Sequence, residues 1–512
     1  MASDSSTQRI DLALGIPVGQ LDDGDSVVGR VGEDEVLLLR KGNAFHAISP
    51  YCTHYHGELA EGLVVGRTIR CPLHHACFDL ATGEALRAPA LDPLDCWQVE
   101  SINGTVRVGE RMRMPARYTT SDGEAPESVV IVGGGAAGMA AAVKLRGCGF
   151  AGRVTLLSAD DFPPCDRPNL SKDYLAGTAP ADWIPLRSPD FYTDNTIDLR
   201  LGRRVTAIDR PSHTVTTDNG EQLRYGKLLL ATGAEPVRLE TPGADPQSVH
   251  YLRTYADASR LVSRSEKAKR IAIIGASFIG LEVAASLRHR GVEVHVVGRE
   301  AVPLERVMGA DMGRWIQSIH EAQGVTFHLE TTVERVEGGV VWLKNGASLG
   351  ACDLIVLGVG VRPVLTLAEQ AGLAVDRGVT VNRYLQTSDP DIFAAGDIAR
   401  WPDPHTGERL RVEHWVVAQS QGQVAAMNML GQPQAYERVP FFWSQHYDTT
   451  IRYVGHAEGW DRTEIDGSFE EQDVIVRYFR GQQLLAVAAL GRELDALYSE
   501  ADMEKEFAAT AR

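Results

Sequence analysis

Cysteine and long apolar runs are scarce in this chain. Five of its seven cysteines, Cys77, Cys96, Cys148, Cys165 and Cys352, show no regular spacing, which argues against a disulfide framework and for a reducing compartment. No run of about eighteen strongly apolar residues occurs, and the N-terminus lacks the basic start and apolar core of a secretion signal. The sequence therefore predicts a soluble, cytoplasmic protein without a membrane segment.

Basic residues are also in the minority. Lys and Arg number 51 against 68 Asp and Glu, for a formal net charge of -17. An acidic surface repels phosphate groups, so we expect no nucleic-acid partner. The length exceeds what one hydrophobic core supports, so several domains are expected.

Two matching Cys/His pairs lie near the N-terminus. Cys52 and His54 form a C-x-H pair, and Cys71 and His74 form a C-x-x-H pair. In a Rieske 2Fe-2S centre two thiolates hold one iron and two neutral imidazoles hold the other, which raises the reduction potential. We therefore predict that these four residues are the metal ligands. A zinc site is the alternative, because Cys2His2 ligation also suits zinc.

The sequence around these pairs resembles Rieske-type ferredoxins over roughly residues 8–110. Respiratory-chain members carry a disulfide where this chain has Gly57 and Leu73, and hydroxyl side chains where it has Ala76 and Phe78. Hydrogen bonds to the cluster sulfurs stabilise the reduced state, so their loss predicts a low potential.

Two histidines depart from the ferredoxin pattern. His56 and His75 occupy positions where such ferredoxins usually have glycine, because the backbone turns closely around the cluster there. One interpretation is a pair of exposed imidazoles beside the cluster. The other is a proton-coupled or altered ligand shell.

Two glycine-rich loops each follow a predicted buried strand and open a predicted helix. They read Gly133-x-Gly135-x-x-Gly138 and Gly275-x-Ser277-x-x-Gly280. Small residues at these positions permit a tight turn and let the backbone approach a pyrophosphate at the helix N-terminus. Two such folds imply two dinucleotides, and the usual division is a permanent flavin in the first and a visiting nicotinamide in the second.

Carboxylates near the second strand of each fold are candidates to bind a ribose. Asp160 is the candidate in the first fold. In the second fold the expected position holds Gly298, and the residues that follow are Arg299 and Glu300. Glu300 would suit NADH and Arg299 would suit NADPH, so both nucleotides stay open. Glu282, just inside the second helix, is a further cofactor-site candidate.

Three more motifs occur in order after the first loop. They are Ala231-Thr232-Gly233, Gly358-Val359-Gly360-Val361-Arg362-Pro363 and Ala394-Ala395-Gly396-Asp397. With the two loops they resemble the FAD-dependent ferredoxin reductases of the glutathione-reductase fold, over about residues 128–512. The resemblance implies that these segments line the cofactor sites and that Asp397 contacts the ribityl and pyrophosphate region of FAD.

The cysteine pattern separates this chain from the disulfide reductases. Those enzymes carry C-x4-C or C-x2-C pairs, whereas Cys165 stands alone here. The run Asp166-Arg167-Pro168-Asn169-Leu170-Ser171-Lys172 instead resembles the oxygenase-coupled reductases. That resemblance implies that Arg167 lies in the flavin site and that Lys172 acts catalytically at the flavin N5 edge. It also implies that Trp415 and Trp443 lie near the isoalloxazine. A surface lysine and core tryptophans are the alternatives.

The whole chain resembles apoptosis-inducing-factor-like proteins of the third type. This implies a multidomain fold with an all-β Rieske module, an α/β glutathione-reductase-like flavoprotein with two dinucleotide-binding domains, and an α+β C-terminal domain. The predicted boundaries are 1–110 for the Rieske domain, 111–127 for a linker, 128–245 and 366–438 for the FAD domain, 246–365 for the NAD(P)H domain and 439–512 for a C-terminal interface domain.

The resemblance implies an electron-transfer enzyme with FAD, a 2Fe-2S cluster and NADH or NADPH. Hydride would pass from NAD(P)H to FAD, and single electrons would pass to the chain's own cluster. An external acceptor protein, such as an oxygenase component, would receive them. The alternatives are a flavin-site reductase of a small molecule and a redox-sensing or signalling adaptor.

Overall fold

The computed structural model describes residues 10–112 and 125–510, with side chains to residue 507 in the last helix. Most of the predicted linker at 111–127 therefore lies outside the described residues. The chain divides into two compact units. The first comprises Met1–Ser121, Val143–Phe150 and Glu493–Arg512, and the second comprises Asp122–Ala142 and Ala151–Arg492.

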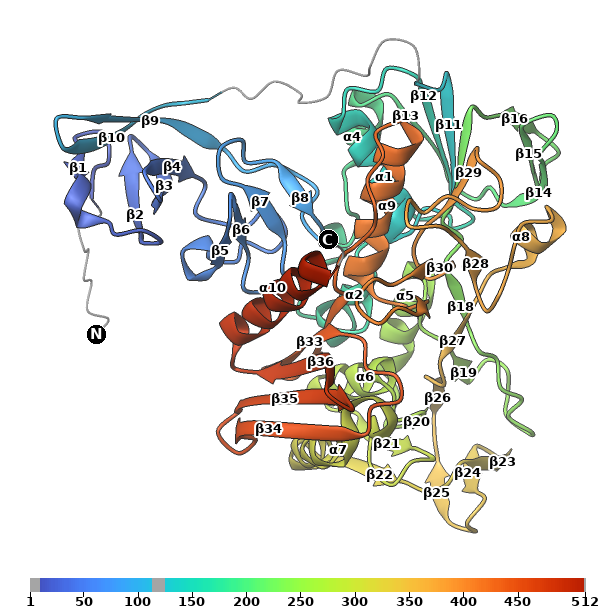
Figure 1. The fold of residues 1–512 in the computed structure, drawn as a ribbon. Coiled ribbons are helices and arrows are strands. Elements are labelled where there is room, and N and C mark those ends of the chain that lie inside the picture. Colours follow the sequence, from blue (N-terminus) through green and yellow to red (C-terminus); the bar gives the residue numbers. More distant parts are fainter. Residues whose placement is uncertain (1–9, 113–124, 511–512) are drawn as a thin grey trace. The chain divides into compact units, whose positions relative to one another are not determined.

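The N-terminal part of the first unit is all-β, as predicted (Figure 1, blue). A six-stranded sheet has the order β1-β10-β9-β4-β3-β2, and a four-stranded sheet has the order β5-β6-β7-β8. The strands are β1 Ile16–Pro17, β2 Ser26–Val31, β3 Asp34–Lys41, β4 Ala44–Ile48, β5 Leu63–Val65, β6 Thr68–Arg70, β7 Cys77–Asp79, β8 Ala85–Arg87, β9 Cys96–Ile102 and β10 Thr105–Arg111. Two short 3-10 turns, Val18–Gln20 and Leu59–Glu61, connect them.

Strand β3 contributes to two separate hydrophobic cores. Leu37 and Leu39 pack with Phe78 in one core, whereas Val36 and Leu38 pack in the other. Successive side chains of a strand point to opposite faces, so four consecutive apolar residues indicate a strand that is covered on both sides.

The last helix of the chain, α10 (Glu493–Thr510), belongs to the first unit. Its Leu497 and Ala501 form a small apolar cluster with Leu63 and Val65 of β5. The helix therefore packs on the four-stranded sheet that carries one of the predicted ligand loops.

The second unit contains two parallel five-stranded sheets of the doubly wound type. One has the order β13-β12-β11-β17-β29 and the other β19-β26-β20-β21-β22. Their strands are β11 Ser128–Val132, β12 Arg153–Leu157, β13 Ile197–Arg200, β17 Lys227–Leu230, β29 Ile392–Ala394, β19 Val249–His250, β20 Arg270–Ile274, β21 Glu293–Val297, β22 Val325–His328 and β26 Leu354–Leu357. The central strands are buried along their length because helices cover both faces.

Helices and small sheets surround these two sheets. The helices are α1 Ala136–Gly147, α2 Arg167–Leu170, α3 Asp173–Ala176, α4 Pro189–Asp194, α5 Tyr255–Ser265, α6 Phe278–His289, α7 Glu305–Ala322, α8 Thr366–Gln370 and α9 Trp415–Met429, with a 3-10 turn at Ala181–Trp183. The short strands are β14 Val205–Asp209, β15 Thr214–Thr217, β16 Gln222–Arg224, β18 Ala234–Pro236, β23 Val333–Glu337, β24 Val340–Leu343, β25 Ser348–Ala351, β27 Val361–Pro363, β28 Val379–Thr380, β30 Ala399–Pro402 and β31 Arg409–Leu410. No described helix is long and apolar enough to cross a lipid bilayer.

The last sheet of the second unit is antiparallel (Figure 1, orange to red). Its order is β32-β33-β36-β35-β34. The strands are β32 Phe441–His446, β33 Thr449–Gly455, β34 Arg462–Ser468, β35 Asp473–Arg480 and β36 Gln483–Leu490. With α10 after β36, this segment has the predicted α+β composition.

Candidate functional site

The two predicted ligand loops have the same backbone conformation. The amide of Cys52 donates to the carbonyl of Gly57 at 2.9 Å, and the Cys52 carbonyl accepts from the amide of His56 at 3.0 Å. Around Cys71 the same two hydrogen bonds measure 2.8 and 3.1 Å, and His75 donates the second one. His56 and His75 therefore hold equivalent positions, and both have positive φ, 54° and 62°. Glycine reaches this conformation more easily, which explains its use in ferredoxins.

The four candidate ligands come together as a sulfur pair and a nitrogen pair. The Cys52 thiol hydrogen-bonds to Cys71, and this contact and burial raise its pKa. The Nδ1 atoms of His54 and His74 lie 3.2 Å apart. Two ligand nitrogens at about 2.1 Å from one metal ion, at the tetrahedral angle, lie roughly 3.4 Å apart. Burial lowers the pKa of His54 to about 3, so its imidazole is neutral, as a metal ligand requires.

The pairing of donors bears on the choice between zinc and an iron cluster. Within residues 10–112 and 125–510, no group of three or more Cys, His, Asp or Glu side chains is placed to hold one metal ion. A mononuclear zinc site needs all four donors around one point, whereas a Rieske cluster needs two donors at each of two irons. The arrangement fits the cluster.

The residues close to the candidate ligands also fit a Rieske-type ferredoxin rather than a respiratory-chain Rieske protein. A Cβ atom on Gly57 would lie 2.9 Å from Leu73 Cδ1 and 2.8 Å from Cys71 Sγ. The two positions that carry a disulfide in respiratory-chain proteins therefore face each other here, and Gly57 has no room for a side chain. Ala76 and Phe78 are fully buried and contribute no hydroxyl group.

The expectation of two exposed imidazoles holds for His56 but is wrong for His75. His56 is exposed, whereas His75 is only 2% exposed and its Nδ1 lies 2.7 Å from Glu500 Oε2 on α10. The sequence contained no local signal for this contact, because the two residues are separated by most of the chain.

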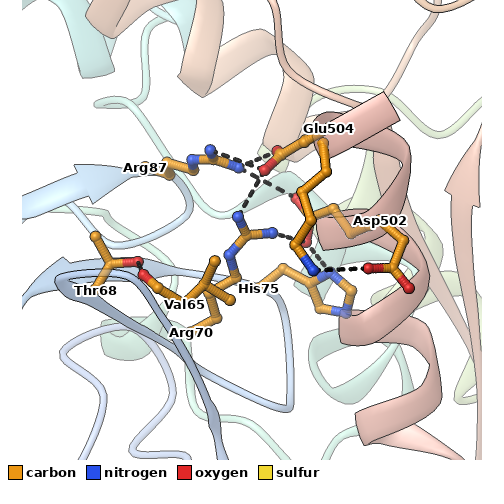
Figure 2. Close-up of polar contacts among 9 residues, drawn as sticks. Val65, Thr68, Arg70, His75, Arg87, Asp502 and Glu504 are labelled. Carbon is orange, nitrogen blue, oxygen red and sulfur yellow. Dashed lines mark hydrogen bonds and ion pairs between the residues drawn. The ribbon is translucent and has the colours of Figure 1, made fainter. Parts of the chain in front are cut away.

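A buried ion network connects α10 with the four-stranded sheet, and Figure 2 shows its members Arg70, Arg87 and Glu504. Glu500 belongs to the same network. Arg70 donates to Glu504 at 2.6 Å and lies 3.4 Å from Glu500, and Arg87 also pairs with both carboxylates. Burial raises the pKa of Glu500, but His75, Arg70 and Arg87 outweigh it and hold the pKa at about 2. His75, which follows His74, thus connects the loop that carries Cys71 and His74 to α10.

The first glycine loop is shaped by two close backbone approaches. A Cβ on Gly133 would lie 2.1 Å from the carbonyl oxygen of Ala231, and one on Gly138 would lie 1.9 Å from that of Gly133. Gly133 also has φ of 121°, a conformation that favours glycine. Gly135 is different, since its nearest neighbour would be Arg167 at 3.8 Å. Its side is open toward a ligand.

The second loop repeats this construction. A Cβ on Gly275 would meet the Gly358 carbonyl oxygen at 2.3 Å, and one on Gly280 would meet the Gly275 carbonyl oxygen at 2.1 Å. Ser277 caps α6, since its hydroxyl accepts from the amide of Gly280 at 3.3 Å and donates to Gly358 at 2.6 Å. Gly360, with φ of 102°, has nothing near its Cβ position. Both predicted dinucleotide loops therefore have the geometry that a pyrophosphate site needs.

Charged residues gather beside the first loop. Arg167 pairs with Asp160 at 3.1 Å, and Arg253 pairs with Asp397 at 2.9 Å. The amide of Gly396 donates to Gln421 Oε1 at 2.8 Å. Arg253 and Gln421 were not predicted, because neither lies in a recognisable motif.

Several buried polar atoms near the first glycine loop have no hydrogen-bond partner among the described residues. Within the described residues, Arg253 Nε, Gln421 Nε2 and His414 Nδ1 have no hydrogen-bond partner. Burying a polar atom without a partner costs about 1–3 kcal/mol. These atoms, with the open side of Gly135, fit a bound polar group such as FAD. The hydroxyl group of Thr232 already has a partner within the chain, because it donates to the Val364 carbonyl at 3.0 Å.

Lys172 and Glu282 form an ion pair in the second unit. It is more buried than the other ion pair between predicted site residues, Arg167–Asp160. Lys172 Nζ donates to Glu282 Oε2 at 2.8 Å, with side-chain exposures of 10% and 3%. The hydroxyl groups of Ser171 and Ser444 also donate to this carboxylate, at 2.6 and 2.7 Å. Lys172 is therefore not a free surface lysine, and Glu282 of α6 is directed toward it.

The remaining predicted residues are half-buried or exposed. Arg299 is exposed and Glu300 half-buried after β21. Trp415 begins α9 and Trp443 lies in β32, and both are half-buried, so neither is a fully enclosed core residue.

Ferredoxin-like ligand loops and two dinucleotide folds define the class of NAD(P)H-dependent flavoprotein reductases. The chain belongs to the pyridine nucleotide-disulphide oxidoreductase family, which it matches over residues 127–422. Residues 14–98 match the Rieske [2Fe-2S] domain and residues 441–511 match the reductase C-terminal domain. The protein is an NAD(P)H:ferredoxin-type oxidoreductase with FAD and a 2Fe-2S cluster, as predicted.

Named relatives support this assignment. The chain is 33% identical to apoptosis-inducing factor 3 of Homo sapiens, over 92% of this chain and 80% of the relative. It is 35% identical to putidaredoxin reductase CamA of Pseudomonas putida, over 72% of this chain and 90% of the relative. The solved covalent putidaredoxin reductase–putidaredoxin complex superimposes with a TM-score of 0.72 and 34% identity, over 74% of this chain and 94% of that chain.

Proposed function

We propose that this protein transfers electrons from NAD(P)H through FAD to its own Rieske cluster, and from there to an external redox protein such as an oxygenase component. The paired thiol and imidazole donors on two equivalent loops carry the proposal. Relatives such as putidaredoxin reductase align with about 72% of this chain. The Rieske domain match at residues 14–98 lies in front of the reductase match, so the chain has a ferredoxin-like module of its own.

Each part of the site has a proposed role. Cys52 and Cys71 would hold one iron, and His54 and His74 the other. The first glycine loop, with Arg167, Arg253 and Asp397, would bind FAD, and the second loop would bind the nicotinamide nucleotide. FAD supplies the ability to accept a hydride and return single electrons. Lys172 would place its ammonium charge at the flavin N5 edge, where Glu282 orients it.

Thiol chemistry is unsupported by the cysteines of this chain. All seven are buried and none forms a disulfide. Burial raises the pKa of Cys165, the cysteine nearest the flavin-site residues, to about 11. Since the thiolate is the reactive form, Cys165 is a poor nucleophile at neutral pH.

We further propose that NADH is the preferred nucleotide. Several relatives are ferredoxin–NAD(+) reductase components, including that of the anthranilate 1,2-dioxygenase system of Burkholderia cepacia at 35% identity. Glu300, which is half-buried after β21, would bind the ribose hydroxyl groups.

An anaerobic titration with NADH and then NADPH, followed by absorbance and electron paramagnetic resonance, tests the proposal. We expect the flavin to bleach and a Rieske signal to appear, with a stronger response to NADH. Zinc in place of iron, or a cluster that stays oxidised while the flavin bleaches, would refute it.

A ligand variant separates the proposed route from its alternatives. In Cys71→Ser, cytochrome c reduction should be lost while ferricyanide reduction at the flavin persists. Cys96→Ser is the matched control, because Cys96 is buried in the same core but is not a proposed ligand. Retained cytochrome c reduction in Cys71→Ser would indicate that electrons leave from the flavin, and absent turnover with every acceptor would favour the adaptor role.

A further inference from the structure

An unbroken line of hydrogen bonds leads away from the Lys172–Glu282 pair. The hydroxyl group of Ser444 lies 2.7 Å from Glu282 Oε1 and 3.2 Å from His446 Nε2. His446 Nδ1 lies 3.2 Å from His320 Nε2, and His320 Nδ1 lies 3.0 Å from the hydroxyl group of Tyr447. All of these residues belong to the second unit, on α6, β32, α7 and the turn after β32.

The carboxylate fixes the direction of every bond in this line. An ionised Glu282 only accepts, so Ser444 donates to it and accepts from His446. A neutral imidazole has one donor and one acceptor nitrogen, so His446 then accepts from His320, and His320 accepts from Tyr447. In this state every donor points toward Glu282, and it is the state left after a proton has gone out through Tyr447. When Glu282 is protonated the bonds reverse: Glu282 donates to Ser444, and each member donates to the next as far as Tyr447. One proton can then leave at the surface as Glu282 gives up its own.

Burial isolates the middle of the line from water. Ser444, His446 and His320 are at most 1% exposed. Burial lowers the pKa of His446 to about 3 and that of His320 to about 2, and the charge of Lys172 acts on His446 in the same direction. Both imidazoles are neutral at physiological pH and retain the donor–acceptor pattern. Tyr447 is half-buried, beside the exposed Asp448, and connects the line to the surface.

The proposed reaction needs a path by which a proton can leave the protein interior. Oxidation of NAD(P)H releases two electrons and one proton: NAD(P)H → NAD(P)+ + H+ + 2e−. The iron–sulfur cluster takes the electrons singly and binds no proton in this balance. One proton per nucleotide must therefore leave the interior near Lys172.

We propose that Glu282, Ser444, His446, His320 and Tyr447 form a proton relay between Lys172 and the surface. It rests on the proposed function, because it serves the proton left at the flavin edge. Each outward transfer changes which ring nitrogen of His446 and His320 carries the proton. The line is reset when both imidazoles exchange their protonated nitrogens and both hydroxyl groups rotate. His446, His320 and Tyr447 are positioning and relay residues rather than groups that touch the cofactors.

The test measures proton release directly in anaerobic stopped-flow mixing of the FAD-loaded holoprotein with NADH. A pH-indicator dye in weak buffer reports the proton, flavin absorbance reports hydride transfer, and excess ferricyanide takes the electrons. Tyr447→Phe removes the outer hydroxyl group and keeps the ring. His446→Ala interrupts the middle and leaves space for imidazole. His295→Gln is the matched control, since His295 forms a similar histidine pair with His328, at 3.0 Å, outside the line.

We expect proton release to be at least tenfold slower in Tyr447→Phe and His446→Ala, with flavin bleaching within twofold of wild type. Added imidazole should restore part of the rate in His446→Ala, which a purely structural defect would not show. Wild-type proton release in Tyr447→Phe, or equal slowing in His295→Gln, would overturn the relay. Because ferricyanide accepts electrons without the cluster, a cluster that stays oxidised would refute the electron route and leave this measurement intact.

Discussion

Glu500→Gln should destabilise the Rieske-containing unit by about 3 kcal/mol at pH 7. Burial raises the pKa of Glu500, but His75, Arg70 and Arg87 lower it from 4.5 to about 2. Each pKa unit is worth about 1.4 kcal/mol, so this shift corresponds to roughly 3 kcal/mol of stability. Removal of one partner of a buried ion pair costs a similar amount, about 3–5 kcal/mol.

The pH dependence follows from the direction of the shift. A carboxyl group whose pKa is depressed by folding stabilises the folded state above its unfolded pKa. The difference between wild type and Glu500→Gln should therefore be constant from pH 7 to about pH 5. It should shrink as the pH falls from 4.5 toward 2, where Glu500 becomes protonated.

Urea unfolding of the holoprotein, followed by the visible circular dichroism of the cluster, measures this effect in the first unit. Asp502→Asn is the control on the same helix. Asp502 is exposed and pairs with Lys505 of α10 at 2.8 Å, so its loss should cost less than about 1 kcal/mol. Equal unfolding curves for the two variants would refute the view that the buried network fastens α10 to the ligand loop.

Three further variants test the flavin loop, the thiol role and the surroundings of the cluster. Gly138→Ala should cost roughly 1–3 kcal/mol of stability and weaken FAD retention, because its Cβ would lie 1.9 Å from the Gly133 carbonyl oxygen; full FAD content after gel filtration would contradict this. Cys165→Ser should keep NADH-dependent ferricyanide reduction within twofold of wild type, and a tenfold loss would revive a thiol role. The double change Ala76→Ser with Phe78→Tyr should make the cluster potential less negative in protein-film voltammetry, and an unchanged or lower potential would count against the sulfur hydrogen-bond argument.

Local motifs were predictable because their chemistry is complete within a few residues. The spacing of Cys52 and His54 predicted one ligand loop, and the glycine loops predicted both dinucleotide folds. In each case the requirement is set by the backbone itself: a positive φ, a close approach to a carbonyl group, or ligands on one turn. These features follow from residue type and spacing.

Long-range side-chain pairs came only from the tertiary structure. Glu282 was expected to serve the cofactor from its own helix, yet packing brings it to Lys172, which is far away in the sequence. His75 was interpreted locally as an exposed imidazole or a ligand-shell variant, and the structure gives it a buried carboxylate on the last helix instead. Such contacts depend on how distant elements pack, and no spacing in the chain encodes them. The sequence by itself determined which cofactors this protein uses, and the tertiary structure decided which charges and hydrogen bonds surround them.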